Sequence, residues 1–488
     1  MHEIETLENK RKLLIQQSRQ TNLAPAEKDR ISRSIEAIRK EIEPLRAKLR
    51  IEESRLVATA DLVGCTFSKA SIAREVFGRS FDAVLIDEAS MAYIPHCAFV
   101  TSLADRRVAV FGDFRQLPPI SQSETNTSNS WLQQDIFEKA KIIHHVEKHI
   151  PDDRLVLLAK QYRMHPEISA IPNELFYAGL LQNADTVLQT TEAIAASNPA
   201  EGKALVLYNT SSLKAFCYSE RESYSRFNII SALVTAKIAA GICAHSNLRI
   251  GIITPYRAQS RLIQKLITDM KLPKERIYTA TVHRFQGSES DIILFDMVEG
   301  KPKQSAGRLV IGDKSSIAMR LANVAISRAR GKFITIADMT YLKERLGSED
   351  IFLQLLQKVE KSAKCFRLTW NDQFTTGFWK EELKGLAHFA SPQLAEEQIT
   401  KDMESANEEI AMYWPSEAEP FSKYLLRDCS NKGIRVFISG TGASHMIIPG
   451  SGSIHRIHEL SQPKFGVVAI DRKLLCVRGH DIPPARTH

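Results

Sequence analysis

The fold class of this chain is set by the stretch AVLIDEAS at residues 83–90, followed by VAVFGDFRQLPP at residues 108–119. Each stretch begins with a short apolar run that leads into acidic residues. An unbroken apolar run of this length is typical of a strand in a parallel sheet, covered on both faces and open to solvent only at its carboxyl end. Ligands bind at such strand ends. The sequence therefore predicts an α/β fold with a site at this edge, and the alternative is a buried strand that leaves its sheet at an ordinary acidic turn.

The polar residues at these two strand ends suit chemistry on a phosphate. Asp87 can hold Mg²⁺ through its water shell while the adjacent Glu88 polarises an attacking water. After the second strand, Gly112 lets the backbone beside Asp113 approach a phosphate, and Gln116 can reach a terminal phosphate oxygen. The sequence LPP that follows then stops the strand. An ordinary proline-stiffened turn is the alternative for this second loop.

Composition limits what can surround this element. With 488 residues and 43% hydrophobic content, the chain is long enough for about three domains. Its 65 Lys and Arg against 57 Asp and Glu give a net charge of +8, which permits a polyanionic partner without requiring one. The seven cysteines form no CxxC pair, and no stretch approaches about 20 apolar residues. A soluble, cytoplasmic protein without a structural disulfide framework or zinc ribbon is expected.

Residues 1–57 are predicted to form two helices with a break near residues 22–25. In the second helix, apolar residues recur at alternating spacings of four and three, which is the seam of a coiled coil. These residues are Ile31, Ile35, Ile38, Ile42, Leu45 and Leu49. Pro44 is expected to kink this helix. The two helices can pack as a hairpin that projects as a stalk, and a plain amphipathic oligomerisation helix is the alternative.

Two α/β regions are predicted to follow, over residues 58–150 and 151–345. The second has apolar strand patterns separated by helical ones, as in a doubly wound sheet. Strands are expected at residues 204–208, 250–254, 292–295 and 333–336. Residues 346–390 are expected to be a helical connector.

Four further motifs place arginine or amide donors beside turns of the second region. They are QYRMHP at 161–166, TPYRAQ at 254–259, TVHRFQG at 281–287 and NVAISRAR at 323–330. The planar guanidinium group can stabilise charge on a γ-phosphate, which phosphoryl transfer requires. Any one of these motifs alone is more often a solvated helix face, so the argument depends on the ordered set.

The six motifs are, in chain order, DEAS, GDFRQLPP, QYRMHPEIS, TPYRAQ, TVHRFQGSESD and NVAISRAR. Together they resemble the motif series of superfamily 1 helicases, in the group that includes the nonsense-mediated-decay helicase. The resemblance implies two RecA-like lobes, the first of them incomplete here, with ATP and Mg²⁺ between them. It also implies movement 5′ to 3′ along single-stranded DNA or RNA, and a helical stalk inserted in the first lobe at residues 1–57.

The resemblance assigns roles position by position. Asp87 and Glu88 serve Mg²⁺ and the attacking water, and Gln116 couples the γ-phosphate to lobe motion. Arg163 and Arg328 are arginine fingers. Further contacts to the nucleotide are implied for Gly112, Asp113, Gln286 and Gly287, and contacts to nucleic-acid phosphates for Thr66, Thr254 and Thr281.

Two departures from the family pattern stand out. His283 takes a position where this group usually has Asp, and retained function is expected because related helicases carry His there. The sequence also contains no GxxxxGK[ST] loop, in which backbone N–H groups, a lysine charge and a hydroxyl ligand for Mg²⁺ together hold the nucleotide. The expectation is that the isolated chain hydrolyses ATP poorly or not at all, and that another protein or an upstream segment supplies the loop.

Residues 391–488 weakly resemble a phospholipase D-like domain. Strands are expected at residues 411–414, 433–438, 465–471 and 474–477. The family chemistry uses an HxK pair with a following Asp. Here Lys464 is present, Gln462 replaces the histidine, and Asp471 falls two residues later than usual. A degenerate module that binds nucleic acid or dimerises is favoured over an active nuclease.

Two classes of function follow from these features. One is an ATP-driven helicase or translocase, with a helicase–nuclease fusion as a variant, and the other is a non-catalytic nucleic-acid-binding subunit that keeps the helicase shape. Both would act on single strands. Either DNA or RNA fits, because the expected contacts are to phosphate and sugar, which carry no base information.

Overall fold

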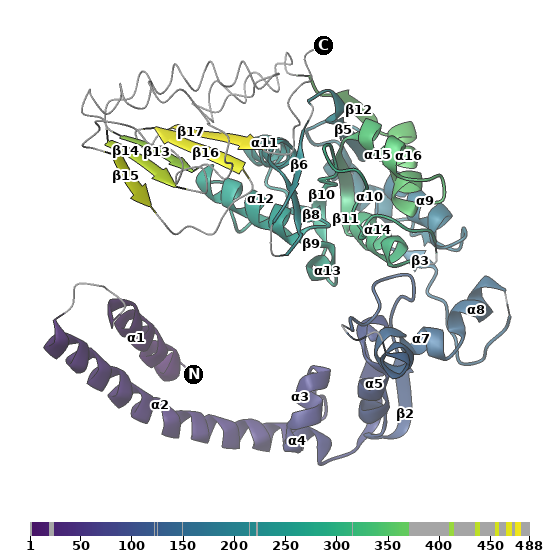
Figure 1. Ribbon diagram of the computed structural model, residues 1–488. Coiled ribbons are helices and arrows are strands. Elements are labelled where there is room, and N and C mark those ends of the chain that lie inside the picture. Colours follow the sequence, from purple (N-terminus) through teal and green to yellow (C-terminus); the bar gives the residue numbers. More distant parts are fainter. Residues whose placement is uncertain are drawn as a thin grey trace, which may run out of the picture. The chain divides into compact units, whose positions relative to one another are not determined.

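The computed structural model describes residues 2–18, 24–121, 123, 125–148, 150–213, 215–220, 223–314 and 316–369, and the backbone of five strands between residues 409 and 479 (Figure 1). The chain divides into two compact units. Unit 1 comprises residues 1–114 and 118–155, and unit 2 comprises residues 115–117 and 156–488. In the described part, no helix is long and apolar enough to cross a membrane.

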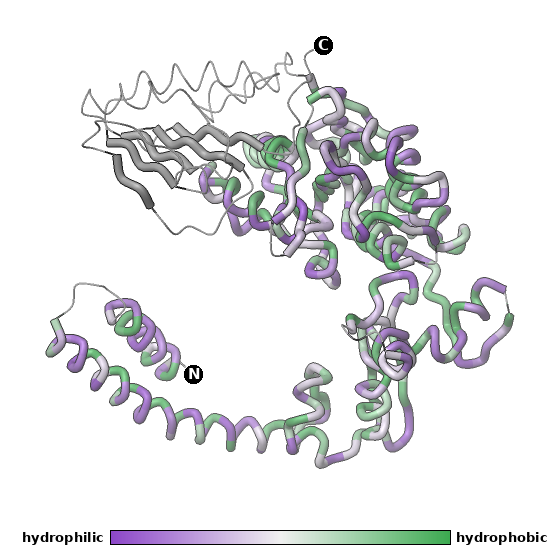
Figure 2. The backbone as a smooth tube through the Cα atoms, viewed as in Figure 1, coloured by the Kyte–Doolittle hydropathy of each residue, from purple (hydrophilic) through white to green (hydrophobic). Residues whose placement is uncertain are grey.

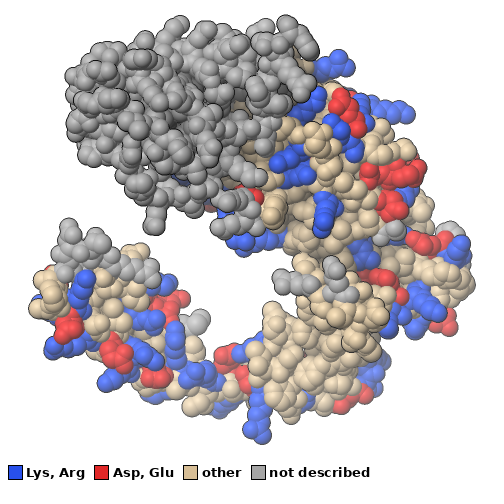
Figure 3. Space-filling model, viewed as in Figure 1, with Lys and Arg blue, Asp and Glu red and all other residues tan. Residues whose placement is uncertain are grey.

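Unit 1 begins with two helices, α1 (His2–Ser18) and α2 (Pro25–Thr59), that pack against each other as a hairpin (Figure 1). Ile38 and Ile42 of the predicted seam are buried, whereas Leu49 is exposed. Hydrophobic and hydrophilic segments alternate along α2 in Figure 2, and both signs of charge are interspersed over the hairpin in Figure 3. The helix runs unbroken through Pro44, where a kink was expected.

The α/β part of unit 1 contains two parallel strands, β1 (Phe81–Ile86) and β2 (Ala104–Val110). The helix α5 (Ile94–Thr101) lies between them in the chain, and Val100 packs with the buried Val84 and Ile86 on one face of the sheet. Leu85, which points to the other face, is 67% exposed. The prediction that β1 is covered on both faces is therefore wrong, because the sheet has two strands in the described residues and its cover lies on one side.

The rest of unit 1 is made of short helices. Residues 62–66 form neither helix nor strand and lead into α3. The short elements are α3 (Phe67–Ile72), α4 (Arg74–Phe77), a 3₁₀ turn (Ala89–Met91), α6 (Asn126–Ser128), a π turn (Asn129–Gln133), α7 (Ile136–Lys139) and α8 (Ile142–Glu147).

Unit 2 is built on a six-stranded parallel sheet in the order β12-β5-β11-β10-β8-β9. Successive strand residues alternate between two hydrophobic cores, as Leu207 and Phe295 join one and Val206 and Leu294 join the other. Helices cover both faces, so the doubly wound parallel sheet expected from the sequence is confirmed, and it fits a RecA-like fold. The strands are β5 (Leu205–Asn209), β8 (Ile250–Thr254), β9 (Ile277–Thr281), β10 (Ser290–Asp296), β11 (Ala329–Ala337) and β12 (Lys364–Arg367).

Helices of the described part of unit 2 lie on both sides of this sheet (Figure 1). They are α9 (Pro166–Leu175), α10 (Val187–Ala195), α11 (Ile229–His245), α12 (Arg257–Asp269), α13 (Val282–Phe285), α14 (Ile317–Ser327), α15 (Met339–Arg345) and α16 (Ile351–Ser362). A 3₁₀ turn lies at Ser211–Leu213, and two small pairs join β3 (Lys160–Gln161) to β4 (Gln182–Asn183) and β6 (Cys217–Ser219) to β7 (Arg226–Asn228). Of the predicted helical connector at residues 346–390, residues 351–362 form α16, and β12 then extends the sheet beside β5. Residues 370–390 lie outside the described residues.

A five-stranded mixed sheet lies near the carboxyl end of the chain. Its order is β15-β14-β13-β16-β17. The pairings β15–β14 and β14–β13 are parallel, and the pairings β13–β16 and β16–β17 are antiparallel. The strands are β13 (Glu409–Tyr413), β14 (Arg435–Ser439), β15 (Ile454–Ile457), β16 (Phe465–Ile470) and β17 (Leu474–Gly479). Four of them match predicted strands, and β15 was not predicted. Lys464 and Asp471 lie outside the described residues, so the phospholipase D-like resemblance stays a prediction.

Candidate functional site

The two acidic residues of unit 1 directly follow β1. Glu88 has a left-handed backbone with φ of 50°, and its N–H donates to Oδ1 of Asp87 at 2.9 Å. The backbone then returns to the sheet, because the N–H of Ala89 donates to the carbonyl of Phe111 at 2.9 Å. A non-glycine residue with positive φ is uncommon and concentrates at functional sites. The turn leaves Asp87 exposed to solvent at the carboxyl end of the sheet.

Gly112 lies at the same edge, just beyond β2. A Cβ atom at this position would lie 2.8 Å from the ring of Phe137 and 3.1 Å from the backbone nitrogen of Ala89. The absence of a side chain is therefore explained by close packing inside unit 1. The nucleotide contacts predicted for Gly112 and Asp113 stay predictions.

In unit 2, Gln116 and Arg328 are in direct contact. Nη2 of Arg328 donates to Oε1 of Gln116 at 2.5 Å, and the arginine is only 2% exposed. The segment 115–117 is held in place by Asn323 of α14, which donates to the carbonyl of Arg115 at 3.0 Å, and by burial of its own Leu117. The glutamine predicted to sense phosphate and one predicted arginine finger thus belong to one structural unit.

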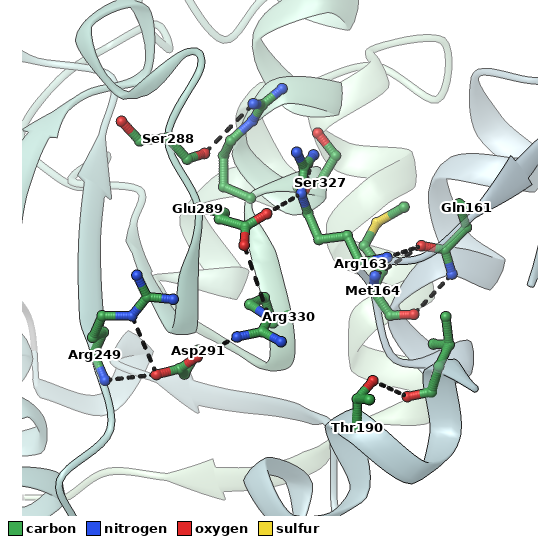
Figure 4. Close-up of polar contacts among 12 residues, drawn as sticks. Gln161, Arg163, Met164, Thr190, Arg249, Ser288, Glu289, Asp291, Ser327 and Arg330 are labelled. Carbon is green, nitrogen blue, oxygen red and sulfur yellow. Dashed lines mark hydrogen bonds and ion pairs between the residues drawn. The ribbon is translucent and has the colours of Figure 1, made fainter. Parts of the chain in front are cut away.

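Arg163 is the second predicted arginine finger, and Glu289 fixes its side chain (Figure 4). Its Nε donates to Oε2 of Glu289 at 2.7 Å, while its Nη1 donates to the carbonyl of Ser327 at 3.4 Å. The backbone N–H of Arg163 donates to Oε1 of Gln161 at 2.9 Å. This guanidinium is partly exposed, in contrast to the buried Arg328.

The same acidic residues join further arginines to Arg163 (Figure 4). Nε of Arg330 lies 3.9 Å from Oε1 of Glu289, and its Nη1 donates to Oδ1 of Asp291 at 3.2 Å. The backbone N–H of Arg249 donates to Asp291 at 2.9 Å. Beside them, Nη1 of Arg328 donates to the carbonyl of Ser288 at 3.5 Å. We call Arg163, Arg249, Arg328 and Arg330 with Glu289 and Asp291 the arginine cluster. The roles of the acidic residues were not predicted, although both stand in the motif QGSESD just before a strand.

The arginine cluster and the predicted nucleic-acid contacts lie at opposite edges of the sheet. Glu289 precedes β10 and Arg328 precedes β11, so the cluster is at the amino-terminal edge. Thr254 and Thr281 end β8 and β9, at the carboxyl-terminal edge. A seven-residue strand such as β10 separates the two edges by about 20 Å. In unit 2 the predicted phosphate chemistry and the predicted strand contacts are thus carried on different edges of one sheet.

The three predicted threonine contacts differ in accessibility. Thr66 is exposed and caps α3, since its Oγ1 accepts from the N–H of Lys69 at 3.2 Å. Thr281 precedes α13 and is partly exposed. Thr254 is fully buried, and its hydroxyl accepts from the N–H of Tyr256 at 3.4 Å. A phosphate contact by the Thr254 hydroxyl therefore requires movement.

Gln286 has two buried polar side-chain atoms without a hydrogen-bond partner among the described residues. Both Oε1 and Nε2 are buried and make no hydrogen bond. A buried amide without partners is costly, by about 1–3 kcal/mol for each unpaired group, so such a side chain is poised for a ligand or a rearrangement. Gly287 beside it has φ of 76°, which favours glycine. Burial lowers the pKa of the neighbouring His283 below its ordinary value.

Comparison with known proteins places these motifs in a family context. Two families described as AAA domain match, one over residues 2–124 and the other over residues 132–340. A homologue of the regulator of nonsense transcripts 1 from Arabidopsis thaliana is 28% identical over 303 residues, which are 61% of this chain and 23% of that protein. The findings support a superfamily 1 helicase. The helicase motifs quoted above all fall within the matched ranges.

Two further relatives of this helicase type come from Schizosaccharomyces pombe. The DNA replication ATP-dependent helicase/nuclease dna2 is 28% identical over 64% of this chain and 22% of its own length. The DNA polymerase alpha-associated DNA helicase A is 27% identical over 69% of this chain and 48% of its own length. The chain thus spans less than half the length of each of these relatives. Among solved structures, the PRRSV helicase aligns with 60% of this chain and 47% of its own at 12% identity, with a TM-score of 0.25 that is too low to bear on the fold.

Proposed function

We propose that this chain is part of an ATP-dependent helicase or translocase that acts on single-stranded nucleic acid. The observation that carries the proposal is the hydrogen bond between Gln116 and Arg328. A glutamine that senses a terminal phosphate and an arginine that stabilises charge on it act on neighbouring oxygens, so contact between them is expected. The relatives named as ATP-dependent helicases support the same activity.

Each polar residue of the site has a task in this proposal. Bound ATP supplies the phosphoanhydride bond whose hydrolysis drives movement. Asp87 would hold Mg²⁺ and Glu88 would accept a proton from the attacking water in unit 1, while Arg163 and Arg328 of unit 2 would stabilise charge on the transferred phosphoryl group. In the described residues, no group of three or more His, Cys, Asp or Glu side chains could hold a metal ion. Phosphate oxygens and water are ordinary further ligands of Mg²⁺.

The phosphate cradle is the part of the site that these 488 residues do not supply. The sequence contains no GxxxxGK[ST] loop, and without it the backbone N–H groups and lysine that hold the phosphates are missing. In the proposal, a polypeptide segment outside this sequence provides the loop, and the chain alone turns over ATP poorly.

Single-stranded DNA or RNA is the proposed partner, with movement 5′ to 3′. Support comes from Thr66, which is exposed, and Thr281, which is partly exposed, each at the start of a short helix. Two relatives are named for DNA replication or DNA helicase activity, and one as a regulator of nonsense transcripts. Both nucleic acids are therefore included in the test.

The test compares ATP hydrolysis by the chain of residues 1–488 with that of a version extended upstream into a GxxxxGK[ST] loop. We expect turnover stimulated by single strands only in the extended chain, and its loss in Glu88→Gln. Comparing single-stranded DNA with single-stranded RNA identifies the preferred strand. Steady stimulated turnover by residues 1–488 alone, abolished by Glu88→Gln, would show that the cradle is not needed and would overturn this part of the proposal.

A non-catalytic nucleic-acid-binding subunit is the second candidate function, favoured by the missing phosphate loop. It predicts binding of labelled single strands that neither ATP nor the upstream extension changes. Hydrolysis by the extended chain would exclude it.

A further inference from the structure

A buried acid, Glu299, joins three segments at the carboxyl-terminal edge of the unit 2 sheet. It lies just after β10, and its side chain is fully buried. Its carboxylate accepts from the hydroxyl of Tyr256, from the guanidinium of Arg226 and from the N–H of Gly307, the last at 3.2 Å. These donors come from the turn after β8, from β7 and from the loop at residues 300–310. We call Glu299 and its three donors the Glu299 cluster.

The loop at residues 300–310 is held closely against this cluster. Arg226 also donates to the carbonyl of Ser305, at 3.0 Å, so one guanidinium binds both the buried acid and the loop. A Cβ atom at Gly307 would overlap the hydroxyl oxygen of Tyr256, which shows how closely the loop backbone approaches the ring. Displacement of the ring therefore requires displacement of the loop.

Tyr256 connects the Glu299 cluster to Thr254, which is the buried one of the three threonines predicted to contact nucleic acid. The hydroxyl of Thr254 accepts from the backbone N–H of Tyr256 at 3.4 Å. Burial, together with the charge of Glu299, holds the pKa of the Tyr256 hydroxyl above its ordinary value, so this hydroxyl keeps its proton and is the donor. Two hydrogen bonds thus link the buried acid to the end of β8.

The hydroxyl of Tyr256 is a bond that can be removed without leaving the acid unpaired. A hydrogen bond to a charged group is stronger than one between neutral groups, so its loss is large enough to shift a local equilibrium. Arg226 and Gly307 still donate to Glu299 when this hydroxyl is absent. We therefore expect its removal to loosen this edge of the sheet while the fold is retained.

We propose that Glu299, acting through Tyr256, is a positioning residue that keeps the Thr254 hydroxyl covered, and that this edge opens when Thr254 binds a phosphate of the single strand. The proposal rests on the proposed binding of single strands. When the binding-competent state is the minor one, the apparent affinity is reduced by its population, so a variant that favours opening binds the strand more tightly. Loosening a merely structural contact would weaken binding or leave it unchanged.

The test uses residues 1–488 and the variant Tyr256→Phe, which keeps the ring and removes the hydroxyl. We expect faster hydrogen exchange at residues 254–256 and 300–307. We also expect at least tenfold tighter binding of a fluorescent oligothymidine or oligouridine, which corresponds to about 1.4 kcal/mol. In the Thr254→Val background, Tyr256→Phe should leave affinity unchanged, because the hydroxyl that it uncovers is absent. The matched control Tyr224→Phe removes a hydroxyl from a residue that is 79% exposed, and it should change neither measurement.

The other outcomes each contradict the proposal. Faster exchange with equal or weaker binding would show that the Tyr256 hydroxyl makes an ordinary packing contact. Equal exchange in the wild type and in Tyr256→Phe would show that this hydroxyl does not hold the edge closed. A gain in affinity that persists with Thr254→Val would assign the gain to another group. Absence of binding in the wild type and in every variant would instead overturn the proposed strand binding on which this inference rests.

Discussion

Arg163 and Arg328 received the same role from the motif series, yet the structure gives them different environments. Arg328 is buried against Gln116, whereas Arg163 is held by Glu289 at a partly exposed position. A buried hydrogen-bonded group is costly to remove, because its partner stays desolvated, while an exposed ion pair contributes little. The two arginines should therefore differ in how much they stabilise the fold.

We expect Arg328→Ala to lower the free energy of unfolding by about 1–3 kcal/mol, because Oε1 of Gln116 loses its donor. Arg163→Ala, the matched variant, should lower it by about 0.2–1 kcal/mol. Urea unfolding of both variants measures the difference. Equal losses would contradict the distinction between the two arginines.

His283 should make stability depend on pH. Burial lowers its pKa in the folded state below the ordinary value of 6.5, so the folded chain holds the neutral ring and the unfolded chain takes up the proton first. Stability is thus fully present above about pH 6.5 and is lost as the pH falls below it. We expect the wild type to lose stability relative to His283→Asn between about pH 6.5 and pH 5, as followed by thermal unfolding. Parallel curves for the two proteins would contradict a buried neutral histidine.

At the scale of elements, the packing of β8 against α13 depends on one glycine. A Cβ atom at Gly251 would lie 2.4 Å from the ring of Phe285 and 2.5 Å from Cδ1 of Ile293. Gly251→Ala should destabilise the protein by about 1–3 kcal/mol, because neighbours in a close-packed core must shift. Gly241→Ala in α11, where the added methyl meets nothing within 4 Å, should stabilise it by about 0.5–1 kcal/mol. Urea midpoints compare the two variants, and a neutral Gly251→Ala would show that this contact is looser than the distances indicate.

The sequence was a good guide to elements with a continuous apolar pattern. The strands β5, β8, β10 and β11 were predicted because both of their faces are buried, so their residues are apolar throughout. The strand β9 was missed because Tyr278 is exposed and threonines interrupt the run, as expected near a sheet edge. The strand β12 was missed because four residues after a helix carry no separate signal.

The site could be predicted only where residue type limits the chemistry. Arginine and glutamine beside turns indicated chemistry on a phosphate. The pairing of Arg328 with Gln116 could not be predicted, because it joins residues 212 positions apart in the chain. Glu289 and Asp291 look like ordinary surface acids in the sequence. Their link to three arginines depends on which strand ends the fold brings to one edge of the sheet.

At the scale of the whole chain, the segment 115–117 belongs to unit 2 although residues on both sides of it belong to unit 1. Leu117 is fully buried in the core of unit 2. If a specific protease site is inserted after Val156, the two halves should co-elute after cleavage, because residues 115–117 still anchor the first half. Leu117→Ala should release them at a lower urea concentration than in the otherwise wild-type chain, as measured by size exclusion. Separation of the halves without urea would contradict this anchoring. So would a urea concentration for separation that Leu117→Ala does not change.

The six-stranded sheet of unit 2 also has a mechanical consequence. The arginine cluster stands at the amino-terminal edge, while Thr254 and Thr281 end strands at the other. Hydrogen-bonded strands resist stretching, and packed cores on both faces transmit strain rather than absorb it. The sheet can therefore move as a rigid body. A force on the guanidinium groups at one edge would then displace the opposite edge by a comparable amount. In the proposed translocase, such rigid-body motion would couple a displacement of charge to a step along the strand without a change inside the sheet.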